Sequence, residues 1–249
     1  MSGSARRSRV RMRTTAVAPG VLFVEGPLSN WTVLTGHGSV ELVDCGYPRD
    51  LRLVERSIAL AGGRMQDLRR ILITHGHSDH LGSSRLLART RGVAVATGPV
   101  EAANVRREIE EQVTLRELLP VLHRPRTIDW VLRAVAAGGL GRVGVPTAVE
   151  LAGTELALTT GHTLRVVPSP GHTSGHTAYL EPSAGVLIAG DALVTGHPLL
   201  DSDGLQLLPG FFHADPDEAA AAGRHLRELP AHWILPGHGA PLKVGEAAA

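Results

Sequence analysis

Cysteine, aromatic residues and long hydrophobic runs are all scarce in this chain of 249 residues. Cys45 is the only cysteine, so neither an intramolecular disulfide nor a cysteine-based zinc site can form, and we expect a reducing, cytoplasmic location. Aromatic residues make up 3%, so the core must be built from aliphatic side chains. No run approaches the ~20 apolar residues of a membrane helix, and no apolar signal segment follows the basic start. We therefore predict no membrane association.

Acidic residues are absent before Glu25, whereas five arginines lie between Arg6 and Arg13. We interpret residues 1–19 as a flexible, Arg-rich tail that precedes one domain at residues 20–249. Such a start also fits an organellar transit peptide or a nucleic-acid-binding arm. The formal net charge is +1, so the chain without those five arginines carries about −4. An acidic body disfavours nucleic acid as the partner and favours a small-molecule substrate.

Apolar runs and helical spacings alternate along the rest of the chain, which indicates a layered α/β protein. Strands are expected at residues 21–24, 31–46 (with a turn near 36–38), 71–74, 93–96 and 233–236. Helices are expected at residues 50–61, 80–91 and 216–229, the last with Asp215 as N-cap and Pro216 at its first position. Residues 101–140 are expected to form two further helices, broken by Pro120 and Pro125.

The stretch ILITHGHSDHLG, residues 71–82, holds three histidines and an aspartate directly after a hydrophobic run. In an extended segment residues i and i+2 point the same way, so His75 and His77 converge on one point. Asp79 and His80 follow where the chain should turn, and face a second point nearby. Burying these groups without a partner would be costly, whereas imidazole and carboxylate ligands suit a divalent ion such as zinc. The stretch therefore predicts a metal site.

Three more polar clusters follow apolar strands: SPGHTSGH (169–176), AGDAL (189–193) and PGHG (236–239). In layered α/β proteins, sites gather where strand ends meet loops. Together with HGHSDH and the earlier LVDCG (42–46), this ordered set resembles the metallo-β-lactamase superfamily over residues 21 to 243. The resemblance implies an α/β fold, a four-layer αββα sandwich, here with a helical insertion near residues 101–140.

The resemblance also implies two adjacent metal sites with nitrogen and oxygen ligands only, which favours two Zn²⁺ ions, with iron or manganese as alternatives. The implied ligands are His75, His77 and His172 at the first metal, Asp79, His80 and His238 at the second, and Asp191 bridging both. Asp44 would support the histidine loop from behind. His176 either orients a ligand in the same way or makes only a loop hydrogen bond.

A hydroxide shared by two metals needs no serine nucleophile, and no G-x-S-x-G motif is present. We predict a hydrolase that cleaves an ester-type bond (thioester, lactone or ester) of a small, apolar acyl substrate. Asp191 and Asp79 would be catalytic, with Asp79 orienting the hydroxide and passing a proton to the leaving group. A nuclease or phosphodiesterase and a mononuclear-iron dioxygenase of the persulfide type are the alternatives. The commonest zinc β-lactamases use a cysteine where Asp191 stands, so that activity is disfavoured.

The insertion at residues 101–140 is rich in apolar side chains, including Leu118 and Trp130. It either packs as a helical pair on the core or forms a lid that binds the acyl part of a substrate. Among the histidines outside the motifs, His213 is the best candidate for lining the pocket, because it follows two phenylalanines. The others are interpreted as structural or surface residues: His37, His123, His162, His197, His225 and His232. Oligomeric state is not predicted.

Overall fold

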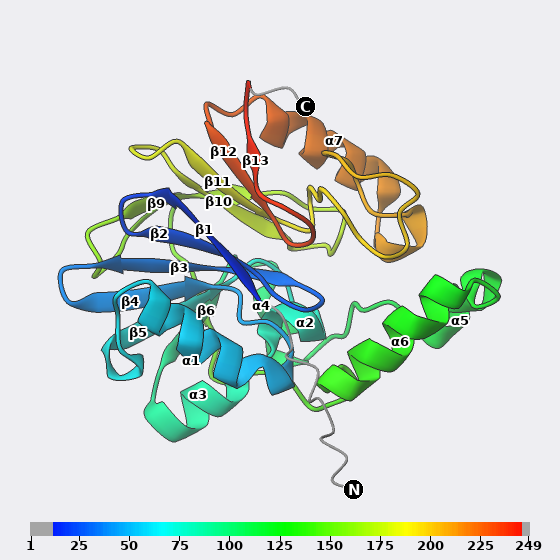
Figure 1. Ribbon diagram of the computed structural model, residues 1–249, viewed down its shortest axis with the longest axis horizontal. Helices are drawn as coiled ribbons and strands as arrows, with labels where there is room; N and C mark the ends of the chain where they lie inside the picture. The colour runs from blue at the N-terminus through cyan, green and yellow to red at the C-terminus, as the bar shows by residue number, and fades with distance from the viewer. Residues whose placement is uncertain (1–11, 246–249) are drawn as a thin grey trace, which may run out of the picture.

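The computed structural model describes residues 12–245, and its two β-sheets pack face to face with helices on the outer sides (Figure 1). This is the predicted four-layer α/β sandwich. The first sheet runs in chain order: β1 (Arg13–Ala18), β2 (Val21–Glu25), β3 (Asn30–Gly36), β4 (Ser39–Val43), β5 (Leu68–Ile73), β6 (Ala94–Thr97) and β7 (Val149–Glu150). The second sheet has the order β13 (Leu242–Lys243), β12 (Trp233–Pro236), β11 (Val186–Gly190), β10 (Thr177–Glu181), β9 (Thr163–Pro168) and β8 (Glu155–Ala157).

The outer helices cover the two sheets from opposite sides. α1 (Leu51–Leu60) and α3 (Ser84–Arg91) lie on the first sheet, and α7 (Pro216–Arg227) lies on the second (Figure 1). The predicted cap of α7 is present, because Asp215 Oδ1 accepts hydrogen bonds from the backbone N–H groups of Asp217 and Glu218 at 2.9 and 3.0 Å. Within residues 12–245 there is no helix whose length and apolar character would let it cross a membrane.

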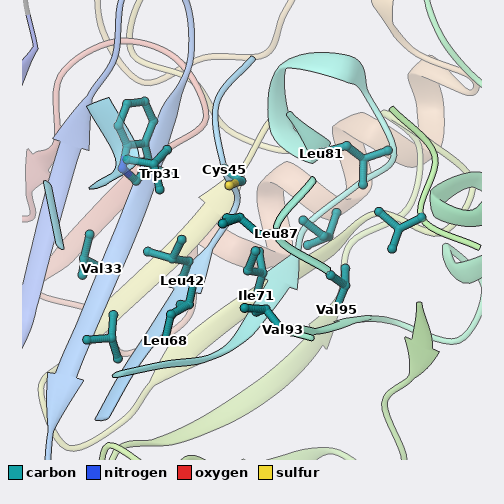
Figure 2. Packing of buried hydrophobic residues seen from close by; sticks show 14 of the residues in the cluster. Trp31, Val33, Leu42, Cys45, Leu68, Ile71, Leu81, Leu87, Val93 and Val95 are labelled. Carbon is teal, nitrogen blue, oxygen red and sulfur yellow. The ribbon is translucent and has the colours of Figure 1, made fainter. Parts of the chain in front are cut away.

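The hydrophobic run of β5 is buried on both faces, as expected for a parallel strand between two layers. Ile71 and Ile73 point to the core beneath α1 and α3, whereas Leu72 joins the core between the sheets. Figure 2 shows Ile71 packed among aliphatic residues of the first core, with Cys45 in the same cluster. Burial raises the pKa of the Cys45 thiol to about 12, so this cysteine is an inert core residue.

The predicted tail at residues 1–19 is wrong in its second half. Residues 13–18 form the edge strand β1, antiparallel to β2, with Arg13 opposite Glu25. Val17 and Ala18 pack against the core between the sheets, while the start of the strand stays exposed. A charged edge strand of this kind resembles a solvated tail in composition. The domain therefore includes residues before position 20, while the prediction for residues 1–11 lies outside the described residues.

The single helix predicted at residues 80–91 is also wrong, because two helices occupy the segment. α2 (Ser78–Leu81) ends at Gly82, which adopts φ +34°, and α3 starts two residues later. A Cβ atom at position 82 would collide with the backbone carbonyl oxygen of Gly46. The close approach to the 45–46 backbone thus requires glycine and breaks the helix.

The insertion at residues 101–140 contains one long helix instead of two. α4 (Ala102–Arg106) ends at Arg107, whose φ of +63° is left-handed, and residues 107–114 are not helical. α5 (Leu115–Leu118) and a 3-10 turn (Leu119–Val121) follow. The second predicted helix is α6 (Pro125–Ala137), which Pro125 starts. In Figure 1, α5 and α6 project beside the two-sheet body, below the loop that precedes α7.

Candidate metal centre

All seven predicted ligands lie together at the edge where strands of both sheets end. His75 and His77 follow β5, His172 lies between β9 and β10, Asp191 follows β11, and the last ligand follows β12. Their ligand atoms form two groups, each within 4.8 Å: His75, His77, His172 and Asp191 in one, and Asp79, His80 and His238 in the other. The topology therefore brings together residues that lie up to 163 positions apart in the sequence.

Asp191 faces both groups. Its Oδ2 lies 3.5 Å from His172 Nε2 and 3.2 Å from His238 Nε2, and its Oδ1 lies 3.4 Å from His80 Nε2. Asp79 belongs to the second group alone, with Oδ2 3.6 Å from His80 Nε2 and 3.4 Å from His238 Nε2. The carboxylate of Asp191 thus lies within 4 Å of ring nitrogens in both groups, and its role as a bridging ligand stays a prediction.

Several polar atoms of the cluster are buried without any hydrogen-bond partner among the described residues. These are His75 Nε2, His80 Nε2 and Asp191 Oδ1. In addition, His77 Nδ1 and His172 Nε2 face each other at 3.1 Å. An unpaired buried polar atom costs free energy, so a set that points inward to common centres fits cations well. The donor chemistry, imidazole nitrogen with carboxylate oxygen, fits divalent transition metals.

In three of the imidazole rings, Nδ1 forms a hydrogen bond outside the cluster, which leaves Nε2 free to bind a metal. His80 Nδ1 donates to Asp44 Oδ2 at 2.9 Å, and His238 Nδ1 donates to the carbonyl of Leu28 at 2.7 Å. Thr74 Oγ1 donates to Asp44 at 2.8 Å, so it accepts from His75 Nδ1 at 3.0 Å. When neutral, each ring is thereby held in the tautomer that directs an Nε2 lone pair into the cluster.

Asp44 lies behind the histidine loop, as predicted. Its carboxylate accepts hydrogen bonds from the backbone and hydroxyl of Thr74, both at 2.8 Å, and from His80. Its own backbone is left-handed, with φ +63°, which is strained for a residue other than glycine. That strain is maintained because three hydrogen bonds hold the carboxylate against the predicted ligand His80 and against Thr74, which precedes the predicted ligand His75.

His176 orients Asp191, the first of the two roles that the sequence left open. Its Nε2 accepts the backbone N–H of Asp191 at 3.1 Å, so its Nδ1 donates to Ser169 Oγ at 2.8 Å. His213 acts similarly on His172. Its Nε2 donates to a backbone carbonyl at 2.9 Å, so its Nδ1 accepts from His172 Nδ1 at 3.4 Å. Both contacts position a ligand from the side facing away from the cluster.

Burial keeps the three histidines of the first group in the neutral form that a metal requires, whereas carboxylates favour a charged His80. Burial lowers the pKa of His75 and His172 well below the usual range and that of His77 to about 4, so these rings are neutral. Burial also disfavours a charged His80, but Asp191 and the other carboxylates outweigh it and raise that pKa to about 10. The carboxylates therefore stabilise positive charge within the cluster, and a bound metal cation can supply that charge in place of a proton.

Glu101 is a site residue that no sequence motif indicated. It is fully buried, and its carboxylate accepts hydrogen bonds from the backbone N–H of Gly76 at 2.6 Å, from Asn104 at 2.7 Å and from Thr173 Oγ1 at 2.7 Å. Gly76 separates two ligands, and Thr173 follows a third. Glu101 thus ties together two ligand-bearing loops, and burial raises its pKa to about 7.

A cavity of about 240 Å³ opens directly above the cluster. Its floor contains His77, Asp79, Asp191 and His238. Its walls are largely apolar and come from the insertion and from the loop before α7: Leu118, Trp130, Val131, Ala134, Val135, Leu140, Leu208 and Phe212. We name this space the acyl cavity, after the acyl substrate that the sequence analysis predicts. The insertion therefore contributes a wall of this cavity, while Leu118 and Trp130 are also packed in a buried cluster, so its role as a lid stays a prediction.

His197, interpreted from sequence as structural, also lines the acyl cavity. Its ring lies 4.9 Å from that of His238 and 5.4 Å from those of Trp130 and Phe212, centroid to centroid. His213 lines a separate cavity of about 290 Å³ together with ligands of the first group. The sequence had singled out His213 through its two preceding phenylalanines, whereas only the spatial arrangement distinguishes His197.

Comparison with known proteins gives the same classification as the fold and the site. The sequence profile described as "Metallo-beta-lactamase superfamily" matches residues 24–238, so the chain belongs to this superfamily. A "Probable metallo-hydrolase YflN" of Bacillus subtilis is 26% identical over 219 residues, covering 82% of this chain and 76% of the relative. Together with the His/Asp cluster, these matches place the chain among the metal-dependent hydrolases of the superfamily.

Two further comparisons concern a solved structure and an enzyme of assigned activity. The crystal structure of a metallo-beta-lactamase family protein from Thermus thermophilus superposes with a TM-score of 0.66 at 26% identity, covering 92% of this chain and 76% of that one. A "Hydroxyacylglutathione hydrolase" of Rhodobacter capsulatus is 31% identical over 132 residues, which is 53% of this chain and 36% of that enzyme.

Proposed function

We propose that this protein is a dinuclear metal hydrolase that cleaves the ester-type bond of a small substrate with an apolar acyl group. The substrate class is a thioester, lactone or ester. One observation carries the proposal: a cavity of about 240 Å³ has the His/Asp cluster as its floor and apolar side chains as its walls. Such a cavity binds a hydrocarbon group while presenting its carbonyl to the cluster.

The seven clustered side chains would hold the two metals, with Zn²⁺ favoured by the nitrogen and oxygen donors over iron or manganese. The first metal would be held by His75, His77 and His172, the second by Asp79, His80 and His238, and Asp191 would contact both. When bound, two divalent ions supply Lewis acidity, which lowers the pKa of water to about 7 and polarises the attacked carbonyl.

Proton transfer during the reaction depends on side chains of the protein itself. Hydrolysis adds the oxygen of water to the acyl carbon, breaks the bond from that carbon to oxygen or sulfur, and delivers a proton to the leaving group. Asp79 is the carboxylate placed to handle this proton, because it lines the acyl cavity and its side chain is 13% exposed. Asp191 lines the same cavity, but its side chain is only 3% exposed, so its catalytic part would be that of a ligand to both metals.

The alternatives draw less support from the site. The walls next to the cluster are apolar, which suits a hydrocarbon better than a nucleic-acid backbone. A mononuclear iron oxygenase uses fewer ligands, whereas here the second group of donors is complete, with three buried or half-buried residues. Lactone hydrolysis and thioester hydrolysis share the same geometry, so the choice between them depends on the leaving group.

Activity should rise with the length of the acyl chain. In an ester series from acetyl to octanoyl, we expect kcat/KM to increase by up to about fourfold per methylene, the equivalent of ~0.8 kcal/mol for each buried CH₂ group. Trp130→Ala should flatten this increase, because Trp130 lines the cavity and is 8% exposed. Leu132→Ala on the same helix is the control, since Leu132 is 64% exposed and lies outside the cavity wall. Equal turnover of all chain lengths would remove the basis for an acyl cavity.

A further inference from the structure

Three arginines from separate segments line a third cavity, of about 370 Å³. Arg85 comes from α3, Arg107 follows α4, and Arg142 lies in the loop after α6. Glu110 is the one acidic residue in the lining, so two positive charges remain in excess. We name this space the arginine cavity. Because no other acidic residue of the described chain lines it, the cavity suits an anionic ligand.

The guanidinium groups of the arginine cavity retain donors for a ligand. Arg142 is exposed and has no hydrogen-bond or ion-pair partner within residues 12–245. Arg85 uses Nη1 for the carbonyl of Gly144 at 2.7 Å, which fixes the group and leaves its other nitrogens available. Arg107 is anchored by Asn104 at 3.1 Å, and its Nε lies 4.0 Å from Glu110. Two arginines are thus held in place and a third is free to close on a ligand.

The arginine cavity adjoins the acyl cavity. Leu140 lines both of them. Gln112 lines the acyl cavity and accepts a hydrogen bond from Arg107 Nη2 at 3.3 Å. The two cavities thus meet at Leu140, which puts the arginines beside the acyl cavity.

We propose that the arginine cavity binds an oxyanion, a phosphate or a carboxylate, on the alcohol or thiol portion of the substrate. The acyl portion then occupies the acyl cavity, and the scissile bond lies over the cluster between them. Arginine is suited to this role because its planar guanidinium pairs with either oxyanion through two parallel hydrogen bonds. The inference rests on the proposed function and specifies its substrate as an ester with an anionic leaving group.

Matched thioesters test this inference. One acyl group is attached to coenzyme A, which carries phosphates, to glutathione, which carries carboxylates, and to N-acetylcysteamine, which is uncharged. We expect kcat/KM to be at least about tenfold higher for one of the charged thioesters, the equivalent of 1.4 kcal/mol. Preference for coenzyme A assigns a phosphate, and preference for glutathione assigns a carboxylate.

Variants of the lining arginines test whether the preference for a charged thioester arises in the arginine cavity. Arg142→Glu and Arg85→Gln should raise KM for the preferred thioester and leave kcat and the uncharged thioester unchanged. Arg89→Glu is the control, because Arg89 is exposed on α3 and lies outside the arginine cavity. Equal rates on all three thioesters, or equal effects of Arg89→Glu and Arg142→Glu, would overturn the inference.

Titration calorimetry with the free thiols separates this inference from the proposed function. If no ester is hydrolysed but coenzyme A or glutathione binds the wild type and not Arg142→Glu, the anion site stands and the hydrolase proposal fails. If esters are hydrolysed without preference and neither thiol binds, the hydrolase proposal stands and the anion site is wrong.

Discussion

Replacing Asp191 by alanine should lower the metal content from close to two divalent ions per chain toward one. Asp191 is the only one of the seven clustered residues whose carboxylate lies within 4 Å of ring nitrogens of both groups, so its loss affects both metals. We expect kcat/KM to fall by more than the roughly 10–100-fold typical of residues that merely support ligands. Elemental analysis of the purified protein, with an ester assay on the same sample, measures both effects.

Asp203→Ala is the matched control, because Asp203 is exposed and has no hydrogen bond to the cluster. It should keep both metals and full activity. One iron per chain in the wild type, unchanged by Asp191→Ala, would contradict the dinuclear hydrolase and favour the oxygenase alternative. Zinc content that falls in the variant while ester hydrolysis persists would remove Asp191 from the mechanism.

Replacing Glu101 by alanine should lower the free energy of unfolding by at least about 3 kcal/mol, because three buried donors lose their acceptor at about 1 kcal/mol or more each. The donors are the N–H of Gly76, the amide of Asn104 and the hydroxyl of Thr173. Metal affinity should fall as well, since two ligand-bearing loops are released. Denaturant unfolding with and without a chelator measures both effects.

Glu111→Ala is the control for this change. Glu111 accepts two hydrogen bonds from Ser174, one residue further along the same loop, but it does so at the exposed surface. We expect its effect on stability to stay below about 1 kcal/mol. If the two variants were equally stable, Glu101 would not be a support of the site.

Glu101→Gln should reveal the raised pKa of this carboxyl through the pH dependence of stability. Burial raises the pKa from the ordinary 4.5 to about 7, so the folded chain binds this proton more tightly than the unfolded chain. Wild-type stability relative to the glutamine variant must then fall as the pH rises from about 4.5 through about 7, by up to about 3 kcal/mol. The difference between the two proteins cancels the other titrating groups. A flat difference would mean that Glu101 ionises normally.

Sequence patterns of short range predicted much of the fold and the cluster. The two-residue spacing of His75 and His77 after a buried strand, and the ordered polar motifs after three later strands, placed seven residues that do lie together. The capping aspartate and proline of α7 were also predicted, because a helix start depends on neighbouring residues alone. In each case the physical cause lies within a few positions of the residue concerned.

Features that depend on distant contacts were missed. Residues 13–18 become a strand because β2 offers hydrogen-bonding partners and a core to pack against, and α2 stops at Gly82 because the 45–46 backbone passes there. Glu101 acts on Gly76, 25 positions before it, and on Thr173, 72 positions after it. No local pattern encodes such pairings.

The sequence by itself therefore indicated the class of fold and the seven His and Asp residues that cluster, because strand periodicity is local and the resemblance to the superfamily rests on short motifs. Tertiary structure alone decided what surrounds the cluster. In the folded chain, the insertion forms an apolar wall beside the cluster and His197 packs next to His238. Three arginines from separate segments line one cavity. A cavity is the space between segments, and its lining depends on how those segments pack.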